Sequence, residues 1–168
     1  MSTPSKEAMT AEMRRVFGSD EKRIAHALSV LSFAEKILQR EQADSNTVIA
    51  AALLHDIGIQ EAERKYGSNA GRYQEIEGPP IAKRILESLG AGQQFVSEVC
   101  DIIGHHHSPR ETETLNFMVL YDSDLIVNLR DDVEPSRLAG MKEKLERMFF
   151  TGTGLDVARD TFFGTGGA

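Results

Sequence analysis

Apolar residues recur along most of the chain at steps of three and four positions, which is the spacing of one face of an amphipathic helix. The segment from about Asp20 to Glu41 shows this well, since Ile24, Leu28 and Leu31 trace one inward stripe. No convincing strand pattern interrupts the helical one. We therefore expect an all-α fold of about seven to nine helices in a single domain, with a core over about 20–130 and C-terminal helices over 135–163 packed on it.

Capping residues, glycines and prolines predict where the helices begin and end. Ser45 suits an N-cap, Gly58 suits a left-handed residue that ends a helix, and Gly78-Pro79-Pro80 suits a helix start. A loop is expected over 67–73 and another over 151–154, and 164–168 should fray. The predicted helices cover 2–17, 20–41, 45–56, 60–66, 81–89, 93–106, 116–129, 135–149 and 155–163.

The predicted helix over 45–56 ends within the apolar stretch Ala50–Gly58, which has the sequence AAALLHDIG. The last two residues of this helix, His55 and Asp56, are titratable. Polar groups are costly to bury without partners, so this pair requires partners from elsewhere in the chain. A histidine beside an aspartate at a buried helix end is well suited to hold a metal ion.

Composition narrows the class of protein. The 168 residues carry a formal net charge of -7, which argues against a general nucleic-acid or membrane surface but permits a local basic pocket. The single cysteine, Cys100, excludes an intrachain disulfide and fits a reducing compartment. The segment Met1–Arg15 lacks the apolar core of a signal peptide, and no stretch reaches membrane-spanning length, so we expect a cytoplasmic protein.

Several other polar residues interrupt apolar helices or lie at their ends. Taken one at a time, each has a structural explanation, such as a satisfied histidine at a helix interface, but one shared site explains all of them together. Imidazole and carboxylate ligands suit a divalent ion such as Fe, Mn, Mg, Co, Ni or Zn. Open coordination positions for water would suit hydrolysis, and the absence of a cysteine cluster argues against a structural zinc site. The residues are His26, His55, Asp56, His105, His106, His107, Asp122 and Asp124.

The order His, His-Asp, Asp resembles the HD-domain superfamily of metal-dependent phosphohydrolases. The resemblance extends from Arg23 to about Leu129, and its ordered set of motifs is more specific than the His-Asp dipeptide alone. The segments that carry it are Arg-Ile-Ala-His at 23–26, Leu-Leu-His-Asp-Ile-Gly at 53–58, Ile-Ile-Gly-His-His-His at 102–107 and Tyr-Asp-Ser-Asp-Leu at 121–125.

The resemblance implies a compact helical bundle in which one metal has four protein ligands. In family members with two metals, Asp56 would bridge them. This chain departs from the two-metal pattern at 75–77, where Glu-Ile-Glu replaces an expected histidine, and this favours a single metal. The implied ligands are His26, His55, Asp56 and Asp124, and the candidates for a second metal or for a proton donor are His106, His107 and Glu77.

The resemblance also implies the reaction, in which metal-activated water cleaves a phosphoester of a nucleotide or small phosphorylated metabolite. Arg23 and Lys83 are the candidates to hold the substrate phosphate. No nucleic-acid polymer and no membrane is expected as a partner, and a homodimer is left open. Two alternatives remain: a di-iron oxygenase of the same superfamily, which would want another histidine near 74–77, and a non-catalytic sensing domain that contains metal.

Overall fold

The computed structural model describes residues 2–164, and every helix of this part of the chain is α-helical except one short 3-10 helix. Its backbone forms no strand within this range, only an isolated bridge between Ser2 and Ala91. The predicted all-α class is therefore confirmed. The α-helices are α1 (Lys6–Phe17), α2 (Glu21–Leu38), α3 (Ser45–Leu54), α4 (Ile59–Tyr66), α5 (Gly71–Ser88), α6 (Gln93–Ile103), α7 (Leu115–Asp132), α8 (Pro135–Ala139) and α9 (Gly152–Phe163), and the 3-10 helix is Lys144–Arg147.

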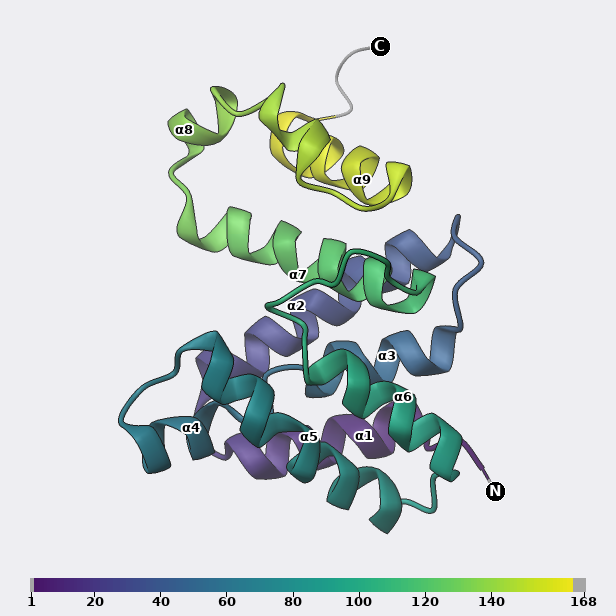
Figure 1. The fold of residues 1–168 in the computed structure, drawn as a ribbon. Coiled ribbons are helices and arrows are strands. Elements are labelled where there is room, and N and C mark those ends of the chain that lie inside the picture. Colours follow the sequence, from purple (N-terminus) through teal and green to yellow (C-terminus); the bar gives the residue numbers. More distant parts are fainter. Residues whose placement is uncertain (1, 165–168) are drawn as a thin grey trace.

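Helices α2, α3, α6 and α7 form the centre of the bundle (Figure 1). Helix α2 packs along both α3 and α7, and α3 also packs against α6. Helix α5 lies against α6 and α4, while α9 packs on α7 and α2 from the opposite side. Helix α8 lies against α9, and the predicted domain organisation stays a prediction.

Helix α3 is buried on nearly all sides because its sequence is almost entirely apolar. Its N-cap is Asp44, whose carboxylate accepts a hydrogen bond from the Thr47 backbone N–H at 2.8 Å, and not Ser45 as predicted. Asp44 has extended backbone angles typical of an N-cap, whereas Ser45 already lies inside the helix. The three consecutive alanines, 50–52, are fully buried and let neighbouring helices approach closely.

Gly58 lies in the turn between α3 and α4, and its predicted left-handed conformation was wrong. Its φ of -86° and ψ of -3° are right-handed. The space around it explains the glycine instead, since an added Cβ would lie only 2.4 Å from the backbone nitrogen of Gly78. The sequence therefore places glycine here for a close backbone approach between this turn and α5.

Helix α5 continues through Pro79 and Pro80, so the prediction of a helix that begins after the prolines was also wrong. A proline inside a helix removes a hydrogen bond and crowds the preceding turn. Contacts on both sides of the prolines offset this cost. Ile85 and Leu86 are buried after them, and Gln74, one turn before them, is buried against α6's C-terminal loop.

The C-terminal third differs from prediction at helix ends. The expected helix over 135–149 is divided into α8 and the 3-10 helix, because Gly140 ends the first piece. The expected loop at 151–154 is instead the start of α9, where the Thr151 hydroxyl accepts a hydrogen bond from the Gly154 N–H at 2.8 Å. At the other end of the chain, the N-cap of α1 is Ser5. The expected fraying falls largely on 165–168, outside the described residues.

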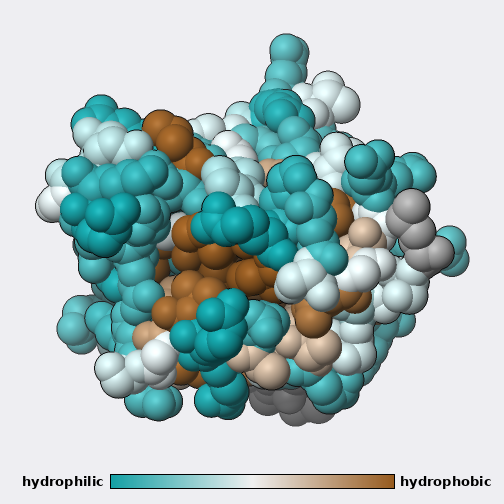
Figure 2. Space-filling view, turned by 90° about the horizontal axis from the view of Figure 1, so that it is seen from below, coloured by the Kyte–Doolittle hydropathy of each residue, from teal (hydrophilic) through white to brown (hydrophobic). Residues whose placement is uncertain are grey.

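One face of the molecule carries an apolar area. Figure 2 shows hydrophobic residues gathered in the middle of the face seen from below, with hydrophilic residues around them. Apolar surface of this kind is where an interface would be sought, but the homodimer stays a prediction. Among the described residues, none of the helices is both long enough and apolar enough to span a membrane.

Candidate metal centre

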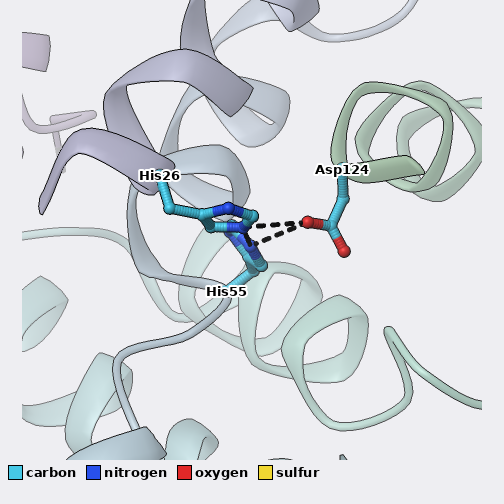
Figure 3. A group of neighbouring side chains, drawn as sticks. All are labelled: His26, His55 and Asp124. Carbon is cyan, nitrogen blue, oxygen red and sulfur yellow. Dashed lines mark hydrogen bonds and ion pairs between the residues drawn. The ribbon is translucent and has the colours of Figure 1, made fainter. Parts of the chain in front are cut away.

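Three side chains from three different helices meet at the centre of the bundle. His26 comes from α2, His55 directly follows α3 and Asp124 comes from α7 (Figure 3). The His26 Nε2 lies 3.0 Å from the Asp124 Oδ1 and 3.2 Å from the His55 Nε2. The His55 Nε2 lies 3.3 Å from the same carboxylate oxygen. Ligands bound about 2.1 Å from one ion lie about 3 Å from one another, so this triangle has the dimensions of a metal site.

A second group of potential ligands adjoins the first. Asp56, His106 and His107 each offer a ligand atom, and these atoms lie within 4.8 Å of one another. The two oxygens of Asp56 face different groups. Its Oδ2 lies 3.4 Å from the Nε2 atoms of His26 and His55, while its Oδ1 lies 3.4 Å from the His106 Nε2. Asp56 therefore lies between two sets of nitrogen and oxygen donors, in the manner of a bridging carboxylate.

The hydrogen bonds of the buried histidines show which ring nitrogen is available. The Nδ1 of His55 donates to the Ala52 carbonyl at 2.8 Å, and the Nδ1 of His106 donates to the Ile103 carbonyl at 2.7 Å. The His106 Nε2 is the buried side-chain N or O atom that lacks any hydrogen-bond partner within the described residues. A buried unpaired nitrogen that faces a carboxylate fits a metal ligand, because a bound ion would satisfy it.

The charges of the centre are strongly coupled. Burial opposes the charged form of His55, but Asp56 and Asp124 outweigh it and raise the pKa of His55 to about 10. Burial likewise opposes ionisation of Asp56, yet His55 and His106 lower its pKa to about 2. The pKa of Asp124 is also held well below its ordinary value, against the cost of burial, by His55 and His26. The protein thus keeps two carboxylates ionised in its interior, as a site for a cation requires.

The three consecutive histidines have three different environments. Both ring nitrogens of His105 have partners, since its Nδ1 bonds the Asp101 carbonyl at 2.6 Å and its Nε2 bonds Glu113 at 2.9 Å. His105 therefore holds the loop after α6 and is not available as a ligand. His106 is 2% exposed and faces Asp56. The residue His107 as a whole is exposed, but its ring is partly buried against Gln74, and this partial burial lowers its pKa, with His106 adding to the effect.

Three residues predicted from the sequence lie outside both ligand groups. Glu77 is buried, but its carboxylate accepts hydrogen bonds from the Lys65 Nζ at 3.0 Å and from the Tyr66 hydroxyl at 2.9 Å. Arg23 is bound by Asp20 and Glu63. Lys83 pairs with Glu87 on the exposed side of α5.

Asp122 is buried and does not face the centre. Its carboxylate accepts hydrogen bonds from the backbone N–H groups of Phe150 and Thr151, each at 2.9 Å, and from the Thr151 hydroxyl at 2.7 Å. Burial raises the pKa of Asp122, and these hydrogen bonds oppose the rise. Asp122 therefore fastens the start of α9 to α7.

Three polar residues border the centre without being typical metal ligands, and the sequence did not predict them. A pocket of about 120 Å³ beside Asp124 is also lined by Tyr121 and Asn128. Gln74 contacts His107, with its Oε1 2.9 Å from the His107 Nε2. Amide and phenol side chains give no pattern that marks them as site residues, so only proximity could identify them. Larger hollows elsewhere, such as the one lined by Asp44 and Gln93, contain none of the clustered ligands.

Comparisons with known proteins show the family to which the chain belongs. Residues 23–149 match the model of the family described as HD domain. The crystal structure of a predicted HD superfamily hydrolase from an uncultured Thermotogales bacterium is 28% identical and aligns with a TM-score of 0.69 over 92% of this chain and 83% of that chain. The resemblance found in the sequence is confirmed.

A curated relative carries a different description. It is a tRNA (cytidine(56)-2'-O)-methyltransferase of Thermoplasma volcanium, 28% identical over 142 residues, which are 79% of this chain and 41% of the relative. This chain thus spans about two-fifths of the length of that relative. The match covers a part of the methyltransferase and does not by itself carry its activity to this chain.

Proposed function

Because the chain belongs to the HD domain family and has a hydrolase-type HD fold, we propose that it is a metal-dependent phosphohydrolase. Its substrate is a phosphoester of a nucleotide or of a small phosphorylated metabolite. The observation that carries the proposal is the position of Asp56 between two groups of donors, one of which includes the unpaired buried Nε2 of His106.

The proposed ligands of the first ion are His26, His55, Asp56 and Asp124. For the second ion they are Asp56, His106 and His107. The sequence alone favoured one ion because 75–77 lacks a histidine, but the second donor group supports two. Glu77 is not among the proposed ligands, since Lys65 and Tyr66 already occupy its carboxylate.

When bound, divalent ions would supply Lewis acidity that makes a coordinated water acidic and offsets the charge of a phosphoryl group. The chain's own residues prepare the site for this. The Ala52 and Ile103 carbonyls fix the ring orientations of His55 and His106. Two ionised carboxylates, Asp56 and Asp124, hold the positive charge in place.

The substrate would enter beside Asp124, where Tyr121 and Asn128 line the pocket with polar atoms. Arg23 stays the predicted phosphate contact on α2, and a substrate phosphate would compete there with Glu63 and Asp20 for its guanidinium. Lys83 stays a prediction as well, although it pairs with Glu87. The net charge of -7 supports a small substrate over a nucleic-acid polymer, because polymer binding requires a basic surface.

The test is metal analysis of protein purified without chelator, followed by phosphate release from a panel of nucleoside monophosphates, sugar phosphates and cyclic nucleotides, the last with an added phosphomonoesterase so that ring opening is also read as released phosphate. Each substrate is assayed with Mn, Fe, Co, Ni, Zn and Mg, and oxygen uptake is followed in parallel with Fe. We expect metal-dependent phosphate release that His55→Ala abolishes and His105→Gln retains. Bound metal without phosphate release from any substrate would favour the sensing domain, and oxygen uptake would favour the di-iron oxygenase.

A further inference from the structure

The ring of His107 is held by the first two turns of α5. Gly71 lies directly beneath it, since an added Cβ there would be 2.9 Å from the His107 Cγ and 3.0 Å from its Cδ2. Glu75 accepts hydrogen bonds from the His107 backbone N–H at 3.2 Å and from the Ser108 hydroxyl at 3.0 Å. Gln74 is the residue of α5 that contacts the ring nitrogen itself.

The amide of Gln74 has its orientation fixed from the other side. Its NH2 group donates to the Asn69 backbone carbonyl at 2.5 Å, and a carbonyl oxygen can only accept. The Gln74 Oε1 must therefore face His107, and it can only accept too. The His107 Nε2, 2.9 Å away, is consequently the donor and carries the proton.

A neutral imidazole with its proton on Nε2 has its lone pair on Nδ1. The heavy atoms nearest to a Cβ added at Gly71 are the His107 Cγ, Cδ2 and Cβ, so Nδ1 is not among the atoms in closest contact with Gly71. One ring nitrogen of His107 lies within 4.8 Å of ligand atoms of Asp56 and His106.

We infer that Gln74 is a positioning residue that fixes the tautomer of His107, so that His107 binds the second ion through Nδ1. His106 has the opposite arrangement, because its Nδ1 donates to the Ile103 carbonyl and leaves Nε2 free. Two adjacent histidines can then offer different ring nitrogens to one ion. This inference rests on the proposed metal site and assigns a role to Gln74. Gln74 lies at the start of the segment 74–77, where the family resemblance leads us to expect a histidine that this chain lacks.

The position of Gln74 is itself supported by a polar network. The Asn69 side chain donates to Glu63 at 3.4 Å, and Glu63 is bound by Arg23 at the start of α2. The backbone carbonyl that orients the Gln74 amide is therefore tied to two other helices. Residues behind a metal ligand commonly contribute about 10- to 100-fold to metal affinity.

The first test needs no metal. Two-bond proton–nitrogen NMR correlations of metal-free protein with ¹⁵N-labelled histidine report which ring nitrogen carries the proton. Near neutral pH we expect His107 to be protonated on Nε2 in the wild type. Gln74→Leu removes the acceptor and should lose this preference, whereas Ile76→Ala leaves the Gln74 amide in place and should retain it.

The second test is metal titration by calorimetry on the same proteins. Gln74→Leu should lower the affinity for the second ion by about 10- to 100-fold and leave the affinity for the first ion as in the wild type. Ile76→Ala is the matched control, since it lies on the same turn of α5 with 57% of its surface exposed and should bind both ions normally. Thermal melts check that every variant is folded.

The outcomes separate the inference from the proposed function. Protonation of His107 on Nδ1 in the wild type, or unchanged second-ion affinity in folded Gln74→Leu, would overturn the role of Gln74 while the hydrolase stands. A wild-type protein that binds only one ion would also overturn it, and phosphate release would still test the hydrolase. Binding of no metal at all would overturn both.

Discussion

Two buried carboxylates on helix α7 stand two residues apart and have opposite roles. Asp122 accepts three hydrogen bonds from Phe150 and Thr151, so its bonding capacity is used within the protein. Asp124 faces the Nε2 atoms of His26 and His55 at 3.0 and 3.3 Å, where donor atoms of several residues converge. Both are aspartates in an apolar helix, and only the completeness of their hydrogen bonding distinguishes them.

The same contrast separates the metal centre from the polar cluster between α4 and α5. Glu77 of α5 is buried, but Lys65 and Tyr66 of α4 satisfy its carboxylate. The metal centre instead contains an unpaired nitrogen, the His106 Nε2. A polar cluster that is fully paired stabilises the fold, whereas one that leaves converging donors unpaired is suited to bind an ion.

The largest expected effect comes from Asp56→Asn, which removes the charge of the residue between the two donor groups while preserving its size. We expect both ions to be lost and phosphate release to fall to the background of the assay. Metal analysis by mass spectrometry and the phosphoester assay measure this. A folded variant that kept its metal and its activity would show that Asp56 is not a ligand.

His106→Ala should remove one ion of the two, because its Nε2 faces only the Oδ1 side of Asp56. Removing a residue that only orients a metal ligand commonly lowers metal affinity or activity by about 10- to 100-fold. Removing the ligand itself should therefore lower kcat/KM by about 100-fold or more. The measurement is metal stoichiometry with steady-state kinetics. Should the stoichiometry of the wild type be one and remain one in the variant, the centre holds a single ion. His105→Gln, at the neighbouring histidine with both nitrogens paired, is the control.

Asp122→Ala tests the structural side of the comparison. It leaves the buried backbone N–H group of Thr151 and the partly buried one of Phe150 without their acceptor. We expect the free energy of unfolding to fall by about 1–3 kcal/mol, measured by urea denaturation. Metal stoichiometry should be unchanged when the variant is folded. Loss of an ion from the folded variant would mean that Asp122 also supports the metal centre.

Glu77→Gln should have the smallest effect, seen mainly in the pH dependence of stability. Lys65 and Tyr66 lower the pKa of Glu77 in the folded protein, so ionised Glu77 stabilises the fold. The stability difference between wild type and variant therefore has its full size at pH values above the ordinary glutamate pKa of about 4.3. It shrinks as the pH falls through the lowered pKa of Glu77 in the folded protein. Thermal melts across this range measure it. A difference that grew toward low pH would contradict the ion pair, and loss of bound metal would return Glu77 to the list of ligands.

Local sequence signals predicted the central helices well and their ends less well. The periodic stripe over 20–41 corresponds to α2, and the apolar stretch before His55 corresponds to α3. The prolines at 79 and 80 led to a wrong prediction of where α5 begins, because contacts of α5 with distant residues outweigh the local cost of a proline. Gly58 misled in a similar way, since its neighbour Gly78 is twenty positions further along the chain.

The sequence by itself determined which imidazole and carboxylate groups interrupt apolar helices, because these can be read directly from residue types and spacing. It also indicated the helical class, which depends on periodicity within each segment. Only the tertiary structure decided which of these groups converge. His26 and Asp124 are 98 positions apart, and Glu77, His105 and Asp122 find their partners in neighbouring segments of the fold. The physical reason is that a ligand differs from a structural residue by which of its atoms remain unpaired, and the pairing partners are supplied by packing.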